Sequence, residues 1–157
     1  MKIGVVSDTH GLLRPQIAPV LAGVERVLHL GDVGDASILR VLEKIAPVTA
    51  VRGNVDRSGP CGRLPETDVL LLEGHYIYML HDLATLHLDP AAAKFSAVLY
   101  GHSHKPSVER RKGVLYFNPG SCGPRRFQLP VTVGLLTIEE GAAPEARVID
   151  LQTASGE

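Results

Sequence analysis

Short apolar runs alternate with polar loops and amphipathic stretches in the first third of the chain. The apolar runs, rich in β-branched residues, predict buried strands over residues 3–7, 24–30 and 48–51. Residues 15–21 predict a short helix with Pro15 in its first turn. A second helix is predicted over residues 36–45, where apolar residues recur at helical spacing after Asp35 as a cap. This order of strand, loop and helix favours parallel βαβ units.

The rest of the chain has shorter apolar runs and more turn residues. Residues 67–73 and 76–80 flank Gly74-His75, which predicts a hairpin, and residues 97–100 predict another buried strand. A β-meander with Gly and Pro turns is predicted over four further runs, residues 107–111, 114–118, 131–139 and 146–151. We expect a short helix over residues 91–94 and fraying of the small, polar residues 153–157.

Bulk properties narrow the class of protein. The 157 residues are the usual size of one domain, and no repeat or long linker divides them, so we expect a single domain over residues 1–157. A hydrophobic fraction of 45% with 21% charged residues is typical of globular proteins. The net charge of -1 gives no support for nucleic acid or an anionic membrane as a partner.

The expected location is the cytoplasm. The apolar run at the N-terminus is too short for a signal peptide, and no segment approaches 18 uninterrupted apolar residues. Cys61 and Cys122 are far apart in the sequence, which favours reduced thiols over a disulfide, although the pairing stays open.

Polar residues directly follow most of the predicted strands. In chain order they are Asp8 and His10, Asp32, Asn54, His81, and finally His102 with His104. The carboxyl ends of parallel strands share one edge of a sheet, so these side chains can converge there. Carboxylate, imidazole and amide groups together suit borderline divalent metals better than thiophilic ones. Asp32 can use both carboxylate oxygens and is the natural bridge between two ions.

Each fragment also has a structural interpretation. Asp8-Thr9-His10 alone is a weak signal, and a Gly-Asp or Gly-Asn pair is first a turn signal, because Asx side chains bond neighbouring backbone groups. Gly101-His102-Ser103-His104 is a stronger signal, since adjacent imidazoles in a turn have few structural uses. The ordered repetition after successive strands is what favours a metal site.

These motifs, with Gly53-Asn54-Val55-Asp56, resemble the signature of the calcineurin-like metallophosphoesterases, in particular the small bacterial and archaeal phosphodiesterases. The segment from Asn118 to Arg125 also resembles this family. The resemblance implies a mixed α/β fold, a two-sheet β-sandwich flanked by helices in four α/β/β/α layers. It implies one metal held by Asp8, His10, Asp32 and His104, and a second held by Asp32, Asn54, His81 and His102.

The resemblance further implies a phosphoesterase, and more narrowly a phosphodiesterase. Manganese is the expected ion, with zinc, iron and nickel as alternatives for the same ligands. A hydroxide bridging the two ions would attack the phosphorus of a small phosphodiester, with Asp32, Asn54 and His81 at the catalytic centre. Homo-oligomers are also implied by the family.

Some positions depart from the family pattern or stay open. Val55 replaces the histidine that many superfamily phosphatases carry near the leaving group, which favours diesters with good leaving groups over alkyl monoesters. Asp82 stands where glycine is more common. Asp56 either orients a loop or is an exposed turn carboxylate. His29 is expected to be packed and hydrogen-bonded, and neither His75 nor His87 fits a ligand position. For Arg125 and Arg126, a solvated pair is favoured over a phosphate contact.

Two other classes of function remain. The retromer subunit of eukaryotes has this fold with degraded metal ligands, so a non-catalytic interaction scaffold is the main alternative. All seven ligand positions of this chain carry coordinating side chains, which favours the enzyme. A metal-dependent hydrolase that acts on something other than phosphorus is the third class.

Overall fold

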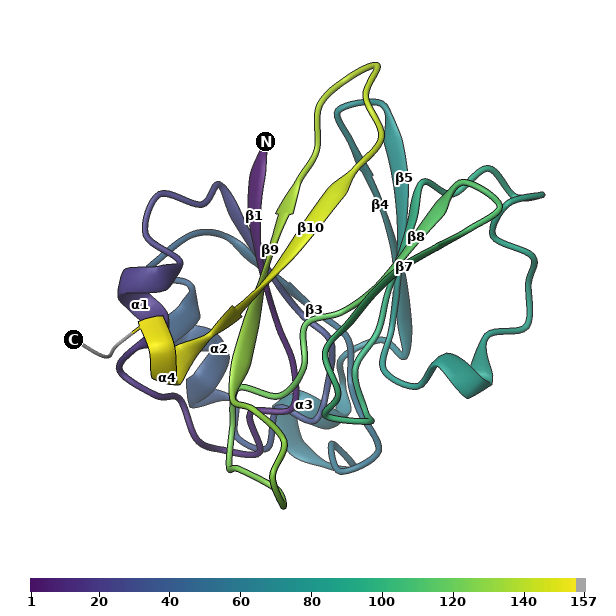
Figure 1. Cartoon of the computed structure of the whole chain (residues 1–157). Helices are drawn as coiled ribbons and strands as arrows, with labels where there is room; N and C mark the ends of the chain where they lie inside the picture. Colours follow the sequence, from purple (N-terminus) through teal and green to yellow (C-terminus); the bar gives the residue numbers. More distant parts are fainter. Residues whose placement is uncertain (155–157) are drawn as a thin grey trace.

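Two five-stranded β-sheets face each other in the computed structural model, which describes residues 1–154 (Figure 1). The first sheet has the order β10-β9-β1-β2-β3 and the second the order β4-β5-β6-β8-β7. The first sheet consists of β10 (Glu145–Asp150), β9 (Thr132–Thr137), β1 (Lys2–Val6), β2 (Arg26–His29) and β3 (Val48–Ala50). The second consists of β4 (Thr67–Leu72), β5 (His75–Leu80), β6 (Ala97–Leu99), β8 (Val114–Asn118) and β7 (Ser107–Arg111).

The predicted parallel units supply three of the five strands of the first sheet. β1, β2 and β3 are parallel neighbours, and their near-continuous apolar sequence suits strands that are covered on both faces. The helices that connect them, α1 (Ile17–Val20) and α2 (Ser37–Leu42), are shorter than predicted. Beyond α2 the chain continues in tighter turns, with the Ile45 amide donating to the Leu42 carbonyl. Asp35 acts as the predicted helix cap, because its Oδ1 accepts a hydrogen bond from the amide of Ser37, the first residue of α2.

The predicted hairpin of the second sheet is present with a different turn. Its turn residues are Glu73 and Gly74, both with positive φ (50° and 79°), whereas Gly74-His75 had been predicted. His75 is paired with Leu72 as the first residue of β5. Positive φ at both central residues gives a turn whose twist matches the strands that it joins.

The predicted β-meander is wrong as a unit. β7 and β8 form a hairpin in the second sheet, whereas β9 and β10 pair in the first sheet, where β9 lies antiparallel to β1. The segment between β8 and β9 therefore crosses from one sheet to the other. Apolar periodicity predicts a strand but not the sheet that the strand joins. Two separate hairpins have the same pattern of apolar residues as one continuous meander.

Helical content also differs from the prediction. Residues 91–94 form a hydrogen-bonded turn and no helix, while the short α3 (Gly59–Gly62) and the 3-10 helix η1 (Leu83–Thr85) were not predicted. The last described helix is α4 (Leu151–Ala154), which includes two residues expected to fray. Residues 155–157, the rest of that expectation, lie outside the described part of the chain.

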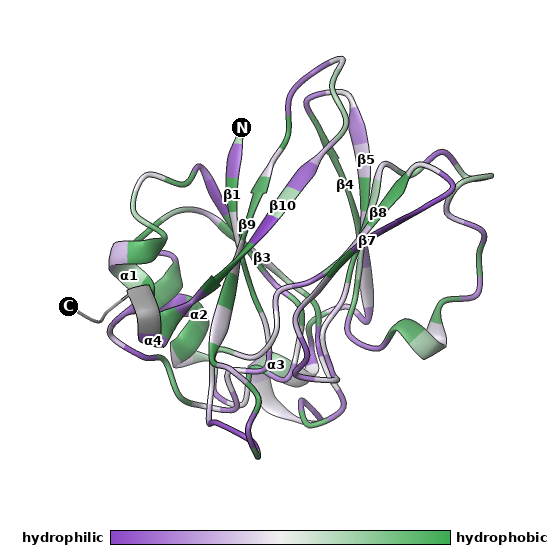
Figure 2. Ribbon diagram, viewed as in Figure 1, coloured by the Kyte–Doolittle hydropathy of each residue, from purple (hydrophilic) through white to green (hydrophobic). Residues whose placement is uncertain are grey.

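Among residues 1–154, three clusters of buried apolar residues hold the layers together. Alternate residues of β1 serve two of them, since Ile3 and Val5 face the second sheet and Val6 faces the helices. In the core between the sheets, Phe117 packs against Gly134, where an added Cβ would lie 2.4 Å from the ring. The apolar strands of both sheets are visible as green ribbons in Figure 2.

The predicted two-sheet sandwich is confirmed. Helices α1, α2 and α4 cover the outer face of the first sheet (Figure 1). The segment that contains η1 lies outside the second sheet. Leu83 and Leu86 of this segment pack against buried residues such as Tyr116. Among residues 1–154, no helix is long and apolar enough to cross a lipid bilayer. Cys61 and Cys122 are both buried and free, so the alternative of a disulfide is not realised.

Candidate metal centre

The polar residues predicted after the strands meet at one edge that both sheets share. Asp8 follows β1, Asp32 follows β2 and Asn54 follows β3, while His81 follows β5 and the pair His102 and His104 follows β6. Backbone hydrogen bonds join these loops: the Asp8 amide donates to Gly31, the His10 amide to Asp32 and the Gly101 amide to His81, at 2.9–3.0 Å. The second sheet therefore supplies three of the seven side chains.

Sharp backbone turns direct these side chains into a common space. Five of the predicted ligands have positive φ, namely Asp8 (58°), His10 (46°), Asp32 (55°), His102 (72°) and His104 (64°). This left-handed conformation is unfavourable for residues other than glycine and is concentrated at functional sites in proteins. Its repetition at the strand ends indicates that the loops are shaped for the position of their side chains.

Asp8 divides its two carboxylate oxygens between the protein and the site. Oδ2 accepts hydrogen bonds from the Ser7 hydroxyl at 2.7 Å and the His102 amide at 3.1 Å. Oδ1 lies 3.4 Å from His104 Nε2, 3.7 Å from His10 Nε2 and 3.8 Å from His81 Nε2. The oxygen that faces the imidazoles is thus the one left without a hydrogen bond.

Asp32 lies between the two groups of imidazoles. Its Oδ2 is 3.5 Å from His10 Nε2 and 3.3 Å from His81 Nε2. Its Oδ1 accepts the Val55 amide at 3.0 Å. Oδ1 is thus hydrogen-bonded to the loop after β3, and Oδ2 is the oxygen that faces His10 and His81.

Asn54, His81 and His102 form the other side of the site. Asn54 Oδ1 lies 3.2 Å from His102 Nδ1. His81 Nδ1 lies 2.7 Å from the Leu30 carbonyl, which can only accept, so Nδ1 carries a proton and Nε2 is the nitrogen that faces Asp32. His81 is buried, whereas Asn54 and His102 are exposed at the rim.

These residues fit divalent metal ions. Asp8 Oδ1 and the Nε2 atoms of His10 and His81 are buried without a hydrogen-bond partner within residues 1–154. An unsatisfied buried polar atom costs about 1–3 kcal/mol, so three that converge need an explanation. Donor atoms bound to one ion at about 2.1 Å lie roughly 3.0–3.4 Å apart. Separations of 3.2 Å for Asn54–His102 and 3.3 Å for Asp32–His81 are of this size.

The donor atoms form two groups whose members lie within 4.8 Å of one another. One group is Asp8, His10 and His104, and the other is Asp32, His81 and His102. Asp32 also contacts His10 of the first group. The arrangement therefore offers candidate ligand sets for divalent ions, with Asp32 at the junction.

The two carboxylates are held in the charged form that a cation requires. Burial alone would raise the pKa of Asp8, but contacts with His10 and His104 hold it well below its usual value. Burial likewise opposes the lowered pKa of Asp32, which His81 and the Val55 amide favour. The pKa of His81 is raised by Asp32 and Asp8 despite its burial. A metal would displace the proton that this pair otherwise holds.

Asp56 supports the site by binding the backbone of two loops that carry proposed ligands. Its Oδ2 accepts the amides of Gly53 at 2.9 Å and Val33 at 3.1 Å, and its Oδ1 accepts the Gly34 amide at 3.0 Å. The side chain is buried, so the alternative of an exposed turn carboxylate is excluded. Asp56 joins the loop that carries Asp32 to the loop that carries Asn54.

His29 is a packed, hydrogen-bonded histidine, as predicted. Its Nδ1 accepts the Gly31 amide at 3.1 Å, so the proton is on Nε2, which lies 2.9 Å from Thr9 Oγ1. Burial lowers the pKa of His29 to about 4, which keeps the ring neutral. The ring thereby ties the loop after β1 to the loop after β2.

Two supporting residues were not assigned a role from the sequence. Asn118 donates its amide to the Gly101 carbonyl and to Ser103 Oγ, both at 3.1 Å, and holds the His102–His104 loop. Ser121 donates its hydroxyl to the Asp8 carbonyl at 3.0 Å. Both lie in the segment that resembled the family, but only the fold shows which loops they reach. Arg125 and Arg126 are exposed, in keeping with a solvated pair.

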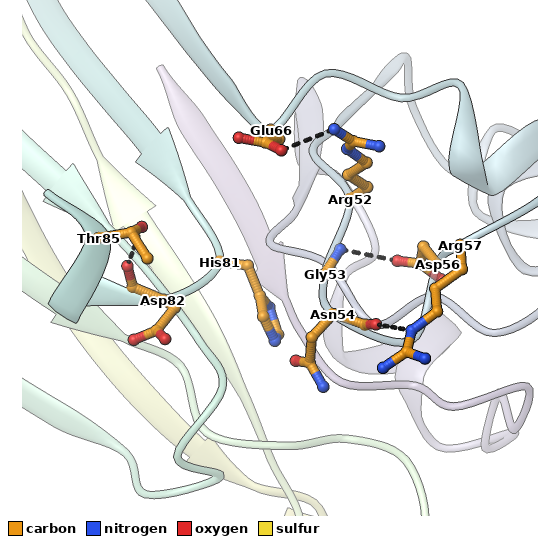
Figure 3. A pocket seen from close by; sticks show the side chains of 9 residues that line it. All are labelled: Arg52, Gly53, Asn54, Asp56, Arg57, Glu66, His81, Asp82 and Thr85. Carbon is orange, nitrogen blue, oxygen red and sulfur yellow. Dashed lines mark hydrogen bonds and ion pairs between the residues drawn. The ribbon is translucent and has the colours of Figure 1, made fainter.

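A pocket of about 460 Å³ opens beside the donor atoms (Figure 3). It is lined by Arg52, Gly53, Asn54, Asp56, Arg57, Glu66, His81, Asp82 and Thr85. Arg52 is neutralised by Glu66 at 2.7 Å, and Arg57 Nε donates to the Asn54 carbonyl at 3.1 Å. The pocket thus has a polar lining, which includes the candidate ligands His81 and Asn54.

A two-sheet sandwich with carboxylates and imidazoles gathered at a shared edge defines the class of the metallophosphoesterases. This chain belongs to the calcineurin-like phosphoesterase superfamily, whose domain model matches residues 1–141. It is 31% identical to the phosphodiesterase YfcE of Escherichia coli K12 over 165 aligned residues, 87% of each chain. The predicted family and the expected hydrolase class are confirmed by these matches.

Solved structures agree with this assignment of the fold. An archaeal phosphodiesterase superposes with a TM-score of 0.79 at 26% identity, covering 96% of this chain and 99% of that protein. Vps29 of Entamoeba histolytica, in a structure described as a complex with Zn²⁺, superposes with a TM-score of 0.74 at 21% identity, covering 96% and 99%. The second likeness bears on the fold alone.

Proposed function

We propose that this protein is a binuclear, metal-dependent phosphodiesterase that hydrolyses a small phosphodiester. The observation that carries the proposal is the convergence of three buried donor atoms that have no hydrogen-bond partner in the described part of the chain, Asp8 Oδ1, His10 Nε2 and His81 Nε2. The family match supplies phosphate esters as the class of substrate. The names of the E. coli and archaeal relatives support the narrower choice of diesters.

The proposed ligand sets share Asp32. One ion would be held by Asp8, His10, Asp32 and His104, the other by Asp32, Asn54, His81 and His102. The spacing of the donor atoms and the grouping of their imidazoles support this division. Manganese is proposed as the native ion, with zinc, iron and nickel as competitors, since the mixed oxygen and nitrogen donors suit all of them.

Two bound divalent ions supply a water made nucleophilic near neutral pH and neutralise charge on the phosphoryl oxygens. The protein itself holds the donor atoms in place and fixes which nitrogen of an imidazole carries the proton. The Leu30 carbonyl fixes the tautomer of His81. The Val55 amide holds Asp32 Oδ1 away from the site, so that Oδ2 faces it. Asn54 and His81 lie where the polar pocket begins, which suits the non-reacting group of a diester.

Val55 contributes no proton donor to the leaving group. Its side chain is 45% exposed, and its backbone amide donates to Asp32 Oδ1. General-acid assistance is typically worth about 10²–10⁴-fold, so its absence at this position favours esters whose leaving group departs unaided. Activated aryl diesters are therefore the proposed test substrates.

The test uses metal-depleted full-length protein and bis(4-nitrophenyl) phosphate. We expect turnover only after Mn²⁺ is restored, with Zn²⁺, Fe²⁺ and Ni²⁺ assayed in parallel. His10→Ala, which removes one proposed ligand, is compared with His87→Ala, which removes an exposed histidine outside the site. Turnover that is absent with every ion, or that survives His10→Ala unchanged, would refute the proposal.

A non-catalytic scaffold is the second candidate, and the fold shared with Vps29 is compatible with it. Because one Vps29 structure is described as a zinc complex, metal binding by itself does not separate the two functions. Metal-dependent turnover does separate them. Stoichiometric metal binding without turnover on any phosphodiester would favour the scaffold.

We also propose that residues 1–157 form one domain, that it acts in the cytoplasm and that it assembles as a homo-oligomer. The first point is supported by the first sheet, in which strands from both ends of the chain pair directly. Two buried, free cysteines support a reducing compartment. Gel filtration with light scattering tests the third point.

A further inference from the structure

Arg57 lines the pocket beside the proposed metal centre, and one nitrogen of its guanidinium is held by the protein. Its Nε donates to the Asn54 carbonyl at 3.1 Å, a contact that Figure 3 shows. Within residues 1–154, this side chain makes no other hydrogen bond and no ion pair with a carboxylate. The two terminal nitrogens are therefore left as a planar pair of donors, the geometry that suits a carboxylate or phosphate.

The other charged groups that line this pocket have partners within the described part of the chain. Arg52 pairs with Glu66 at 2.7 Å, and the buried carboxylate of Asp56 accepts three backbone amides. Asp82 Oδ2 lies 3.9 Å from an imidazole of the proposed metal centre. Arg57 is thus the lining cation that is available to an anion from outside the protein.

The pocket has room for more than the phosphoryl group of a substrate. Its volume of about 460 Å³ lies within the usual range of small-molecule sites, about 300–1,000 Å³. Asn54 and His81 are proposed metal ligands on its wall, so a phosphate bound to the ions would lie beside them. The remaining space would receive the ester group that does not leave, and Arg57 is part of the wall of that space.

We propose that Arg57 is a specificity-determining residue that binds a second oxyanion, carried by the ester group that stays on the phosphate. This inference rests on the proposed phosphodiesterase function and narrows its substrates to diesters whose non-leaving group is negatively charged. Because Nε is already fixed by the Asn54 carbonyl, the guanidinium loses less freedom when it binds than an unattached one would. The oxyanion is a carboxylate or a phosphate, since both match the planar pair of donors.

The experiment compares three diesters of 4-nitrophenyl phosphate, whose second group is propyl, 2-carboxyethyl or 2-phosphonoethyl, with the Mn²⁺-loaded full-length protein. In Arg57→Gln, the ratio of kcat/KM for an anionic ester to that for the propyl ester should fall about tenfold, as for one charged hydrogen bond. The ester with the larger fall identifies the oxyanion. Arg57→Lys should keep part of the ratio. Arg63→Gln, which removes an exposed cation outside the pocket, should leave it unchanged.

A purely structural role of Arg57 predicts a different result. The three esters share one leaving group, so a disturbed Asn54 loop would lower all three rates equally, and that result overturns the proposal. An equal fall of the ratio in Arg63→Gln also overturns it, because a general loss of positive charge would then be the cause.

Binding without turnover separates this inference from the proposed function. Calorimetry with 2-carboxyethyl, 2-phosphonoethyl and propyl methylphosphonate, which have no good leaving group, measures the same preference. A preference for an anionic analogue that Arg57→Gln removes, without turnover of any ester, contradicts the proposed function and supports the role of Arg57. Turnover without such a preference overturns the role of Arg57 alone. If no analogue binds and no ester is hydrolysed, both proposals fail.

Discussion

Asp32 presents its two carboxylate oxygens to different partners, and this division was not visible in the sequence. Gly31-Asp32 predicted a carboxylate after a strand, but not that Oδ1 would accept the Val55 amide from another loop. That contact requires Gly53 to approach closely, since a Cβ there would lie 2.1 Å from Asp32 Oδ1. The motif predicts the residue type, whereas the contacts from a second loop decide which atom is available.

Asp32→Ala is expected to abolish binding of both ions, because Asp32 Oδ2 lies 3.5 Å from His10 Nε2 and 3.3 Å from His81 Nε2, one imidazole of each group. His104→Ala should mainly weaken the site that contains Asp8. Metal content of the purified variants, measured by elemental analysis at fixed free Mn²⁺, checks both. Full occupancy in Asp32→Ala would show that this residue does not join the two sites.

Val55→His tests the explanation for diester preference. The new imidazole would replace an exposed side chain next to Asn54, so the fold should tolerate it. If it protonates the leaving group, the rate on 4-nitrophenyl phosphate should rise relative to the rate on the diester, by about tenfold or more. Val55→Asn is the control for added polarity. An unchanged ratio in Val55→His would contradict the leaving-group argument.

At the scale of elements, the strands were predictable, as were the parallel pairs of β1 to β3 and the hairpin of β4 and β5, but the sheet that β9 and β10 join was not. Apolar runs predicted every strand of both sheets to within a few residues, because burial on one or both faces leaves a pattern in the sequence. The hairpin of β4 and β5 turned one residue earlier than predicted, at Glu73, since a residue other than glycine accepts positive φ there. The loops at the strand ends depend on contacts between elements, such as those of Asp56.

Asp56→Ala should destabilise the fold by about 3 kcal/mol. Three backbone amides from two loops lose their charged acceptor in a buried position, where such bonds are worth the most. For a chain of this length, the expected fall in melting temperature is roughly 10 °C. Asp89→Ala, which removes an exposed turn carboxylate, should cause little change. Thermal denaturation of the metal-free proteins distinguishes the two variants without the contribution of bound ions.

At the scale of the whole molecule, the candidate site belongs to both sheets at once. The sequence predicted that strand ends converge, and it treated them as the edge of a parallel sheet. In the structure, the loops after β1, β2 and β3 meet those after β5 and β6 of the other sheet. The order of the donor residues along the chain was enough to predict which residues form the candidate site, because that order does not depend on how the two sheets stack. The stacking of the sheets depends on apolar cores, and the identity of an apolar residue does not indicate which residues it will pack against.

β1 is a central strand of the first sheet, although it is the first to be synthesised. One of its neighbours, β9, spans Thr132–Thr137, so about 130 residues must leave the ribosome before β1 is paired on both sides. Until then, the edge of β1 has unpaired backbone groups, which are prone to association with other chains. The loop that carries Asp8 also needs Ser121, whose hydroxyl donates a hydrogen bond to the Asp8 carbonyl. We therefore expect the metal centre to mature only after Ser121 and β9 have left the ribosome, with the nascent chain dependent on protection of that open edge.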